Sequence, residues 1–294
     1  MISEEIVWKV NQPEKVVALL RAYKHLATID EVVTILIRPK RIDFFSESSD
    51  NSSALICTFN NTFFNDFHGS TPKVFAIFSR LLVQATEVHK SSIVSILTKI
   101  RREEFLDVFV EYNSGVQASY GIPFTDRVHE ICQAGGPELP LYPSWVADHY
   151  VFWDEKIIKL FPGSHSHLAI KLTSAGLEVR IFDIDKTEKY SASHPIKLNR
   201  NRIQVYEPHK EIEITTIPFG RLKTFVETSK KCKFNVQMSP EFNEQTSQTY
   251  WQCYDDKKSV YFTLLLGCEV TDDRMSVKTE TQDEGDLRAF RKIN

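Results

Sequence analysis

Two histidines and two aspartates have spacings that could support metal or acid–base chemistry. His165 and His167 lie two residues apart in GSHSHLA, so one strand would present both on the same face as metal ligands. No CxxC motif, HExxH motif or nearby carboxylate cluster completes such a site. Asp255 and Asp256 lie in YDDKKS, and aspartate favours hairpin turns because its side chain bonds the local backbone. We interpret both pairs as turn residues and predict no metal and no other cofactor.

A thiol nucleophile is the second chemistry to consider. Cys132 follows His129 by three residues, but both precede the Gly- and Pro-rich stretch QAGGPELPLYP, and such a connector is a poor scaffold for catalysis. The chain has no GxGxxG, GxxxxGK[ST] or GxSxG motif. Its 5 cysteines are odd in number and scattered, which is typical of reduced thiols in the cytosol or nucleus. We therefore predict that the protein is not an enzyme; a hydrolase with an unrecognised site is the distant alternative.

Basic residues form the pattern that remains. In PFGRLKTFVETSKK (218–231), the apolar Phe219, Leu222, Phe225 and Val226 occupy about a third of a helical wheel, and the basic residues lie outside that arc. Three other segments, 11–28, 70–88 and 144–161, have apolar stripes at helical spacing, and in the first two a proline lies near the start. Basic residues on the exposed faces of these four predicted helices are Lys15, Arg21, Lys24, Lys73, Arg80, Lys156, Lys159, Arg221, Lys223, Lys230 and Lys231.

These basic faces stand out because the chain as a whole is slightly acidic, with 36 Lys and Arg against 39 Asp and Glu. A solvated surface without a partner explains any single basic face. Three of four helices biased in the same direction favour one shared anionic partner, and nucleic acid is the candidate.

Short segments rich in Val, Ile, Phe and Thr fill the space between the predicted helices, and many alternate as strands do. Each half therefore contains a helix, several strands, a second helix and more strands. This order predicts an α+β fold built as two similar domains, each with two helices packed on an antiparallel sheet. The predicted ranges are 1–122 for the first domain, 123–143 for a connector, 144–270 for the second domain and 271–294 for a flexible tail. We find no secretory signal in MISEEIVWKV, and the most apolar run, 260–270, is too short to cross a membrane.

Residues 26–67, LATIDEVVTILIRPKRIDFFSESSDNSSALICTFNNTFFNDF, resemble the nine-type subunit of the heterotrimeric checkpoint sliding clamp. The family features are a Leu-Ser-x-Ile-like turn (here Leu26–Ile29), a Ser-rich turn (48–53) and an FFxxY/F segment (63–67). Segments 105–126 and 212–238 are similar to the last hairpin of the family's first domain and to its final helix and strands. The FFNDF segment also occurs in a sister subunit, so a sister checkpoint subunit or a PCNA-like processivity factor is an alternative.

The resemblance implies a PCNA-like clamp fold, in which two sister subunits and this chain form a ring around double-stranded DNA. Contacts from the helices to the phosphates would be independent of DNA sequence. The implied partners are an RFC-like clamp loader and checkpoint and repair effectors, and the implied location is the nucleus. Leu139, Leu141 and Tyr142 of the connector would line a pocket for partner peptides. Ser276, Thr279 and Thr281 are possible phosphorylation sites in a tail shorter than the family often has. The alternative from another class is a clamp-like interaction module that does not encircle DNA.

Overall fold

The computed structural model describes residues 6–69, 71–87, 92–101, 104–133, 145–147, 166–173, 176–184, 190–192, 196–198, 203–205, 212–232, 235–243, 248–267 and 269–270. The first half contains helices α1 (Pro13–Ile29), α2 (Ser79–Glu87) and α3 (Glu130–Gln133) and the 3-10 turn η1 (Asn61–Phe63). Its strands are β1 (Val7–Val10), β2 (Val32–Arg38), β3 (Arg41–Glu47), β4 (Ser53–Asn60), β5 (Asp66–His68), β6 (Lys73–Phe78), β7 (Ile93–Arg101), β8 (Phe105–Tyr112) and β9 (Gln117–Thr125).

The second half contributes one described helix, α6 (Phe219–Cys232). Its strands are β10 (Trp145–Ala147), β11 (Ser166–Thr173), β12 (Gly176–Ile184), β13 (Tyr190–Ala192), β14 (Ile196–Leu198), β15 (Ile203–Val205), β16 (Ile212–Pro218), β17 (Asn235–Asn243), β18 (Gln248–Tyr254), β19 (Val260–Gly267) and β20 (Glu269–Val270).

Helix α1 forms where the sequence predicts it. Pro13 occupies its first turn, where the missing N–H would have no helical partner. Residues at helical spacing, including Leu19, Tyr23 and Leu26, are buried against the sheet. Val17, which the sequence pattern assigns to the same stripe, is instead exposed, because it lies about 100° around the helix from the buried Val16.

The second predicted helix begins later than the sequence indicates. Residues Lys73–Phe78 form strand β6, and only Ser79–Glu87 are helical. Strand β6 pairs antiparallel with β2 along its whole length, from Lys73 opposite Ile37 to Phe78 opposite Val32. Its Val74, at 44% exposure, alternates with the buried Phe75, as strand residues do. Sheet pairing therefore overrides a spacing that also suits a helix, and Lys73 belongs to a strand.

The start of the predicted helix over 144–161 is also wrong, because Trp145–Ala147 form strand β10, which pairs with β15. The rest of that segment, with Lys156 and Lys159, lies outside the described residues. Helix α6 is confirmed, with Pro218 as the last residue of β16 and the helix starting at Phe219. Strand β9 continues to Thr125, past the predicted domain end at 122.

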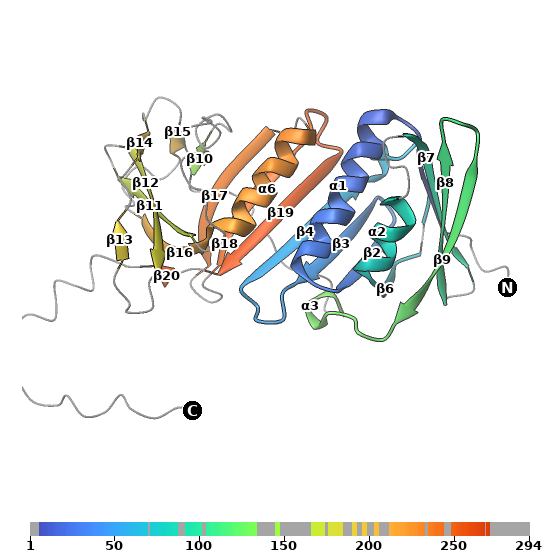
Figure 1. Ribbon diagram of the computed structural model, residues 1–294, viewed down its shortest axis with the longest axis horizontal. Coiled ribbons are helices and arrows are strands. Elements are labelled where there is room, and N and C mark those ends of the chain that lie inside the picture. Colours follow the sequence, from blue (N-terminus) through green and yellow to red (C-terminus); the bar gives the residue numbers. More distant parts are fainter. Residues whose placement is uncertain are drawn as a thin grey trace, which may run out of the picture.

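The sheets join the two halves of the chain. Among the described residues, a 12-stranded sheet has the order β17-β18-β19-β4-β3-β2-β6-β9-β8-β7-β1-β5. The second half enters it through β19, which pairs antiparallel with β4 from Val260 opposite Phe59 to Leu266 opposite Ser53. A 6-stranded sheet contains β13, β12, β11, β16 and β20, with β14 beside β12. The pairing of β4 with β19 thus makes one surface from segments about two hundred residues apart (Figure 1).

Three helices lie side by side on one face of the 12-stranded sheet, with α1 between α2 and α6 (Figure 1). The main core lies beneath them and includes Trp8, Phe44, Phe225, Trp251 and Phe262, all fully buried. Alternate residues of the same strands face the opposite side, because strand side chains alternate between faces. That side has its own buried cluster, made of Leu36, Phe45, Ala54, Ile56, Cys132 and Leu265. None of the described helices is long and apolar enough to cross a membrane.

Candidate nucleic-acid interface

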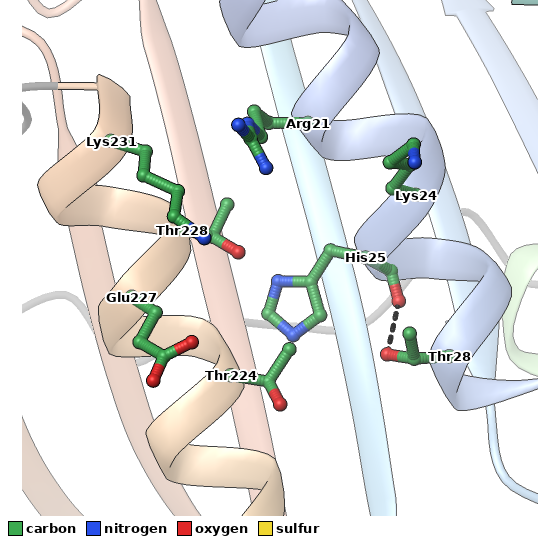
Figure 2. A pocket seen from close by; sticks show the side chains of 8 residues that line it. All are labelled: Arg21, Lys24, His25, Thr28, Thr224, Glu227, Thr228 and Lys231. Carbon is green, nitrogen blue, oxygen red and sulfur yellow. Dashed lines mark hydrogen bonds between the residues drawn. The ribbon is translucent and has the colours of Figure 1, made fainter. Parts of the chain in front are cut away.

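Helices α1 and α6 bring predicted basic residues from the two halves of the chain together. Between them lies a polar pocket of about 140 Å³ (Figure 2). Four residues of α1 and four of α6 line it: Arg21, Lys24, His25, Thr28, Thr224, Glu227, Thr228 and Lys231. We call this site the seam pocket. It brings Arg21 and Lys24 together with Lys231, which is about two hundred residues away in sequence, and all three were predicted to face a nucleic acid.

The charges around the seam pocket are unevenly balanced. Lys24 forms an ion pair with Glu87 of α2, with Nζ 2.8 Å from the carboxylate oxygen. Glu227 is the one acidic side chain among the residues that line the pocket. Arg221, one helical turn before Thr224, is close enough to lower the pKa of His25. Arg21, Arg221 and Lys231 therefore give the seam a positive excess, which suits an anionic partner.

The other predicted basic residues are dispersed. Lys15 donates a hydrogen bond from Nζ to the carbonyl of Thr62 at 3.2 Å, and its Nζ lies 5.6 Å from the centre of the Phe63 ring. Burial, followed by the charge of Lys257, lowers the pKa of Lys15. Arg80 is exposed on α2, with its guanidinium 5.7 Å from the Phe78 ring centre. Lys15 and Arg80 thus belong to the helices of the candidate interface but not to the seam pocket.

The other predicted site residues lie elsewhere on α6 or outside the described residues. Lys223 is partly exposed on α6, and Lys230 lies in the same helix. The remaining members lie outside the described residues: Lys156, Lys159, Leu139, Leu141, Tyr142, Ser276, Thr279 and Thr281.

His25 is the seam residue that the sequence analysis missed. Its side chain points from α1 into the gap toward α6 (Figure 2), and the residue is only 2% exposed. The ring lies 6.0 Å from that of Phe225, and both ring nitrogens are buried without a hydrogen-bond partner. Burial, and then the nearby Arg221, lowers the pKa of His25 to about 3. Its position four residues after Arg21 places it beside that arginine on the helix, a signal that was available in the sequence.

The buried neutral state of His25 predicts an acid-sensitive fold. Below pH 6.5 the unfolded chain binds a proton at His25, whereas the folded chain does not until about pH 3. His25 is therefore neutral in both states above pH 6.5, and as the pH falls toward 3 its burial lowers the stability of the fold by up to ~1.4 kcal/mol per pH unit. We expect His25→Leu to remove this component. Urea unfolding of both proteins between pH 7 and 4.5 measures it, and parallel curves would contradict the assignment.

Cys132 and His129, which the sequence analysis rejected as a catalytic pair, do not form a nucleophile. Nδ1 of His129 lies 2.7 Å from the hydroxyl of Thr34, and that hydroxyl accepts the backbone N–H of His129 at 3.1 Å. Cys132 is buried, and burial raises its pKa to about 12, so the thiol stays protonated at neutral pH. His129 and Cys132 instead attach the segment after β9 to the sheet face opposite the helices.

The paired aspartates also have a structural role, at least in part. The carboxylate of Asp255 accepts hydrogen bonds from the backbone N–H groups of Ser259 and Val260 and from the Ser259 hydroxyl. These bonds close the turn between β18 and β19, as expected for aspartate in a hairpin. His167 lies in β11, and His165 lies outside the described residues. Within the described part of the chain, no group of three His, Cys, Asp or Glu residues is arranged to hold a metal ion.

Comparison with solved structures identifies the architecture. The proliferating cellular nuclear antigen of Entamoeba histolytica superposes with a TM-score of 0.65 at 12% identity, covering 90% of this chain and 98% of that one. PCNA of A. fulgidus, solved with the C-terminal region of FEN-1, gives a TM-score of 0.64 at 10% identity, covering 91% and 100%. No protein-family model and no curated protein sequence matches the chain. The continuous sheet, the row of helices on one face and these superpositions show that the chain has the α+β fold of the PCNA-like sliding clamps.

Proposed function

We propose that this chain is a non-enzymatic subunit of a sliding clamp that encircles double-stranded DNA. The observation that carries the proposal is the position of the basic residues within the clamp fold. Helices α1, α2 and α6 share one face of the sheet, and Arg21, Arg221 and Lys231 gather where α1 meets α6. Cations on such a face bind phosphates without reading base sequence, and this type of contact allows a ring to slide.

Among the described residues, one edge of strand β9 is unpaired along most of its length, and this edge supports assembly with other subunits. Along Gln117–Pro123 the described pairing of β9 is with β8. On its other side β9 meets β6 only at its end, through Phe124 and Thr125. The rest of that edge can accept a strand from another chain through main-chain hydrogen bonds. We infer that a sister subunit pairs there and that two such partners complete a three-membered ring.

The more specific identity rests on the resemblance of residues 26–67 to the nine-type checkpoint subunit. These residues include β2, β3, β4 and η1, and β4 is the strand that pairs with β19 of the second half. On this basis we propose a nuclear heterotrimeric clamp that an RFC-like loader places at damaged DNA, where it acts as a platform for checkpoint and repair effectors. The E. histolytica and A. fulgidus proteins are PCNA, and the second was solved with a bound FEN-1 segment, which supports docking of partner peptides on this fold.

The test is topological. The chain is purified from cells with its stable partners, and the mass of the complex is measured by light scattering after size exclusion. We expect a particle of three clamp-sized subunits rather than a 34.0 kDa monomer. Once loaded, it should stay on closed circular DNA and leave after the circle is cut, because a ring slides off an end. A chain that remains monomeric with all co-purified partners, or that stays on cut DNA equally well, would favour the interaction module.

A further inference from the structure

The seam pocket has two features that a diffuse basic surface does not explain. One is its position between α1 and α6, with four lining residues from each helix. The other is His25, whose buried ring points into the gap with both nitrogens unpartnered (Figure 2). An unpaired buried polar group is costly, so a ring nitrogen at a pocket wall can form its missing hydrogen bond with a group that enters the pocket.

The lining determines the chemistry of that ligand. Arg21 and Lys231 contribute positive charge from opposite walls, while Lys24 is engaged with Glu87. The remaining wall consists of the hydroxyl and methyl groups of Thr28, Thr224 and Thr228, together with the carboxylate of Glu227. His25 is neutral at physiological pH, so one ring nitrogen carries a proton that it can donate. Guanidinium, ammonium and a neutral N–H donor together suit an oxyanion.

The size of the pocket limits the ligand further. Its volume of about 140 Å³ is several times the ~30 Å³ share of one water molecule, and well below the roughly 300–1,000 Å³ of pockets for drug-sized ligands. One tetrahedral group fits within this volume. The hydroxyl of Thr224 donates to the carbonyl of Gly220 at 3.0 Å, and neither ring nitrogen of His25 forms a hydrogen bond with it.

We propose that the seam pocket is a binding site for one phosphate group, which we call the seat. Arg21 of α1, Lys231 of α6 and a ring N–H of His25 hold the phosphate there. If the bound phosphate belongs to the DNA backbone, this inference rests on the proposed function. Free inorganic phosphate is the other candidate ligand. Since the two helices come from different halves of the chain, an occupied seat also ties the halves together. Binding to the folded chain then raises its stability by mass action.

Phosphate binding at the seat can be tested on the purified single chain, without assembly into a clamp. Imidazole ¹⁵N and ¹H NMR signals of His25 are identified by their loss in His25→Leu. They are then followed during titration with inorganic phosphate, against sodium chloride of equal ionic strength. We expect a saturable shift and a rise in melting temperature with phosphate only. The double variant Arg21→Gln, Lys231→Gln should bind phosphate roughly tenfold more weakly or worse. Its matched control, Lys40→Gln, Lys257→Gln, removes the same charge from two exposed turns and should bind as the parent does.

A second arm uses the assembled complex and duplex DNA. A His25 shift with both phosphate and DNA, or with DNA alone, supports the seat, and the latter assigns the DNA backbone as its source. A shift with free phosphate alone supports a seat for that anion. Unmoved His25 signals with both ligands would overturn the seat, even if the ring stays on circular DNA as proposed. Loss of circle-dependent retention with an intact phosphate shift would instead count against the clamp function and leave the seat in place.

Discussion

Replacing Arg21, Arg221 and Lys231 with glutamate is expected to weaken DNA binding by the assembled clamp on the order of a hundredfold at about 0.1 M salt. The three side chains converge at the α1–α6 seam, so the substitution removes three cations and adds three repulsive charges at one place. Each phosphate contact contributes about one unit to the slope of log affinity against log salt, because it releases condensed counterions. The slope should therefore become shallower by about three, as measured by retention on DNA across a salt series.

A matched variant separates this local effect from a change in net charge. Lys40→Glu, Arg127→Glu, Lys257→Glu makes the same charge change at three exposed positions away from the seam. Lys40 and Lys257 lie in turns, and Arg127 pairs with Glu31 beyond the end of β9. We expect this variant to retain most of the affinity and the parent salt slope. Equal losses in both variants would show that the α1–α6 seam is not the DNA-facing surface.

Phe262→Ala is expected to cost about 3–5 kcal/mol in the free energy of unfolding. Phe262 is fully buried in β19, opposite Cys253 of β18 on one side and Cys57 of β4 on the other. Its ring meets that of Phe59 edge-on, with centroids 6.1 Å apart. Truncation leaves a cavity beneath the strand pair that joins the two halves, and dense packing around it limits collapse. Because domains are typically stable by only about 5–15 kcal/mol, urea unfolding should show a large shift in midpoint.

The control for this substitution is Val94→Ala in β7, where the side chain is exposed. We expect a change within about 0.5 kcal/mol there, as for most surface positions. Limited proteolysis adds a second measurement, since weakened pairing of β4 with β19 should expose these two strands to cleavage. A cost below about 1 kcal/mol for Phe262→Ala would mean that this junction tolerates loss of its largest packed ring.

Local patterns predicted many individual elements. Strands β2, β3 and β4 lie where runs of Val, Ile and Phe predict them, and α1 and α6 lie where an apolar stripe recurs at helical spacing. The pattern failed over residues 73–78, where alternation and helical spacing overlap. The main-chain hydrogen bonds to β2 decided in favour of a strand. Such short apolar segments are ambiguous because their conformation depends on partners distant in the sequence.

Residue spacing was enough to predict which faces of α1 and α6 are apolar and which are basic, because side-chain direction around a helix follows from that spacing. The proximity of these two helices, in contrast, depends on the packing of the whole fold. That packing includes the pairing of β4 with β19, whose residues are about two hundred positions apart. The same contact buries His25 and places Arg21 beside Lys231, although no local signal links them. Long-range packing buries apolar surface from both halves and thereby brings the residues of the candidate site together. Each segment can be predicted from its own sequence, but their proximity cannot.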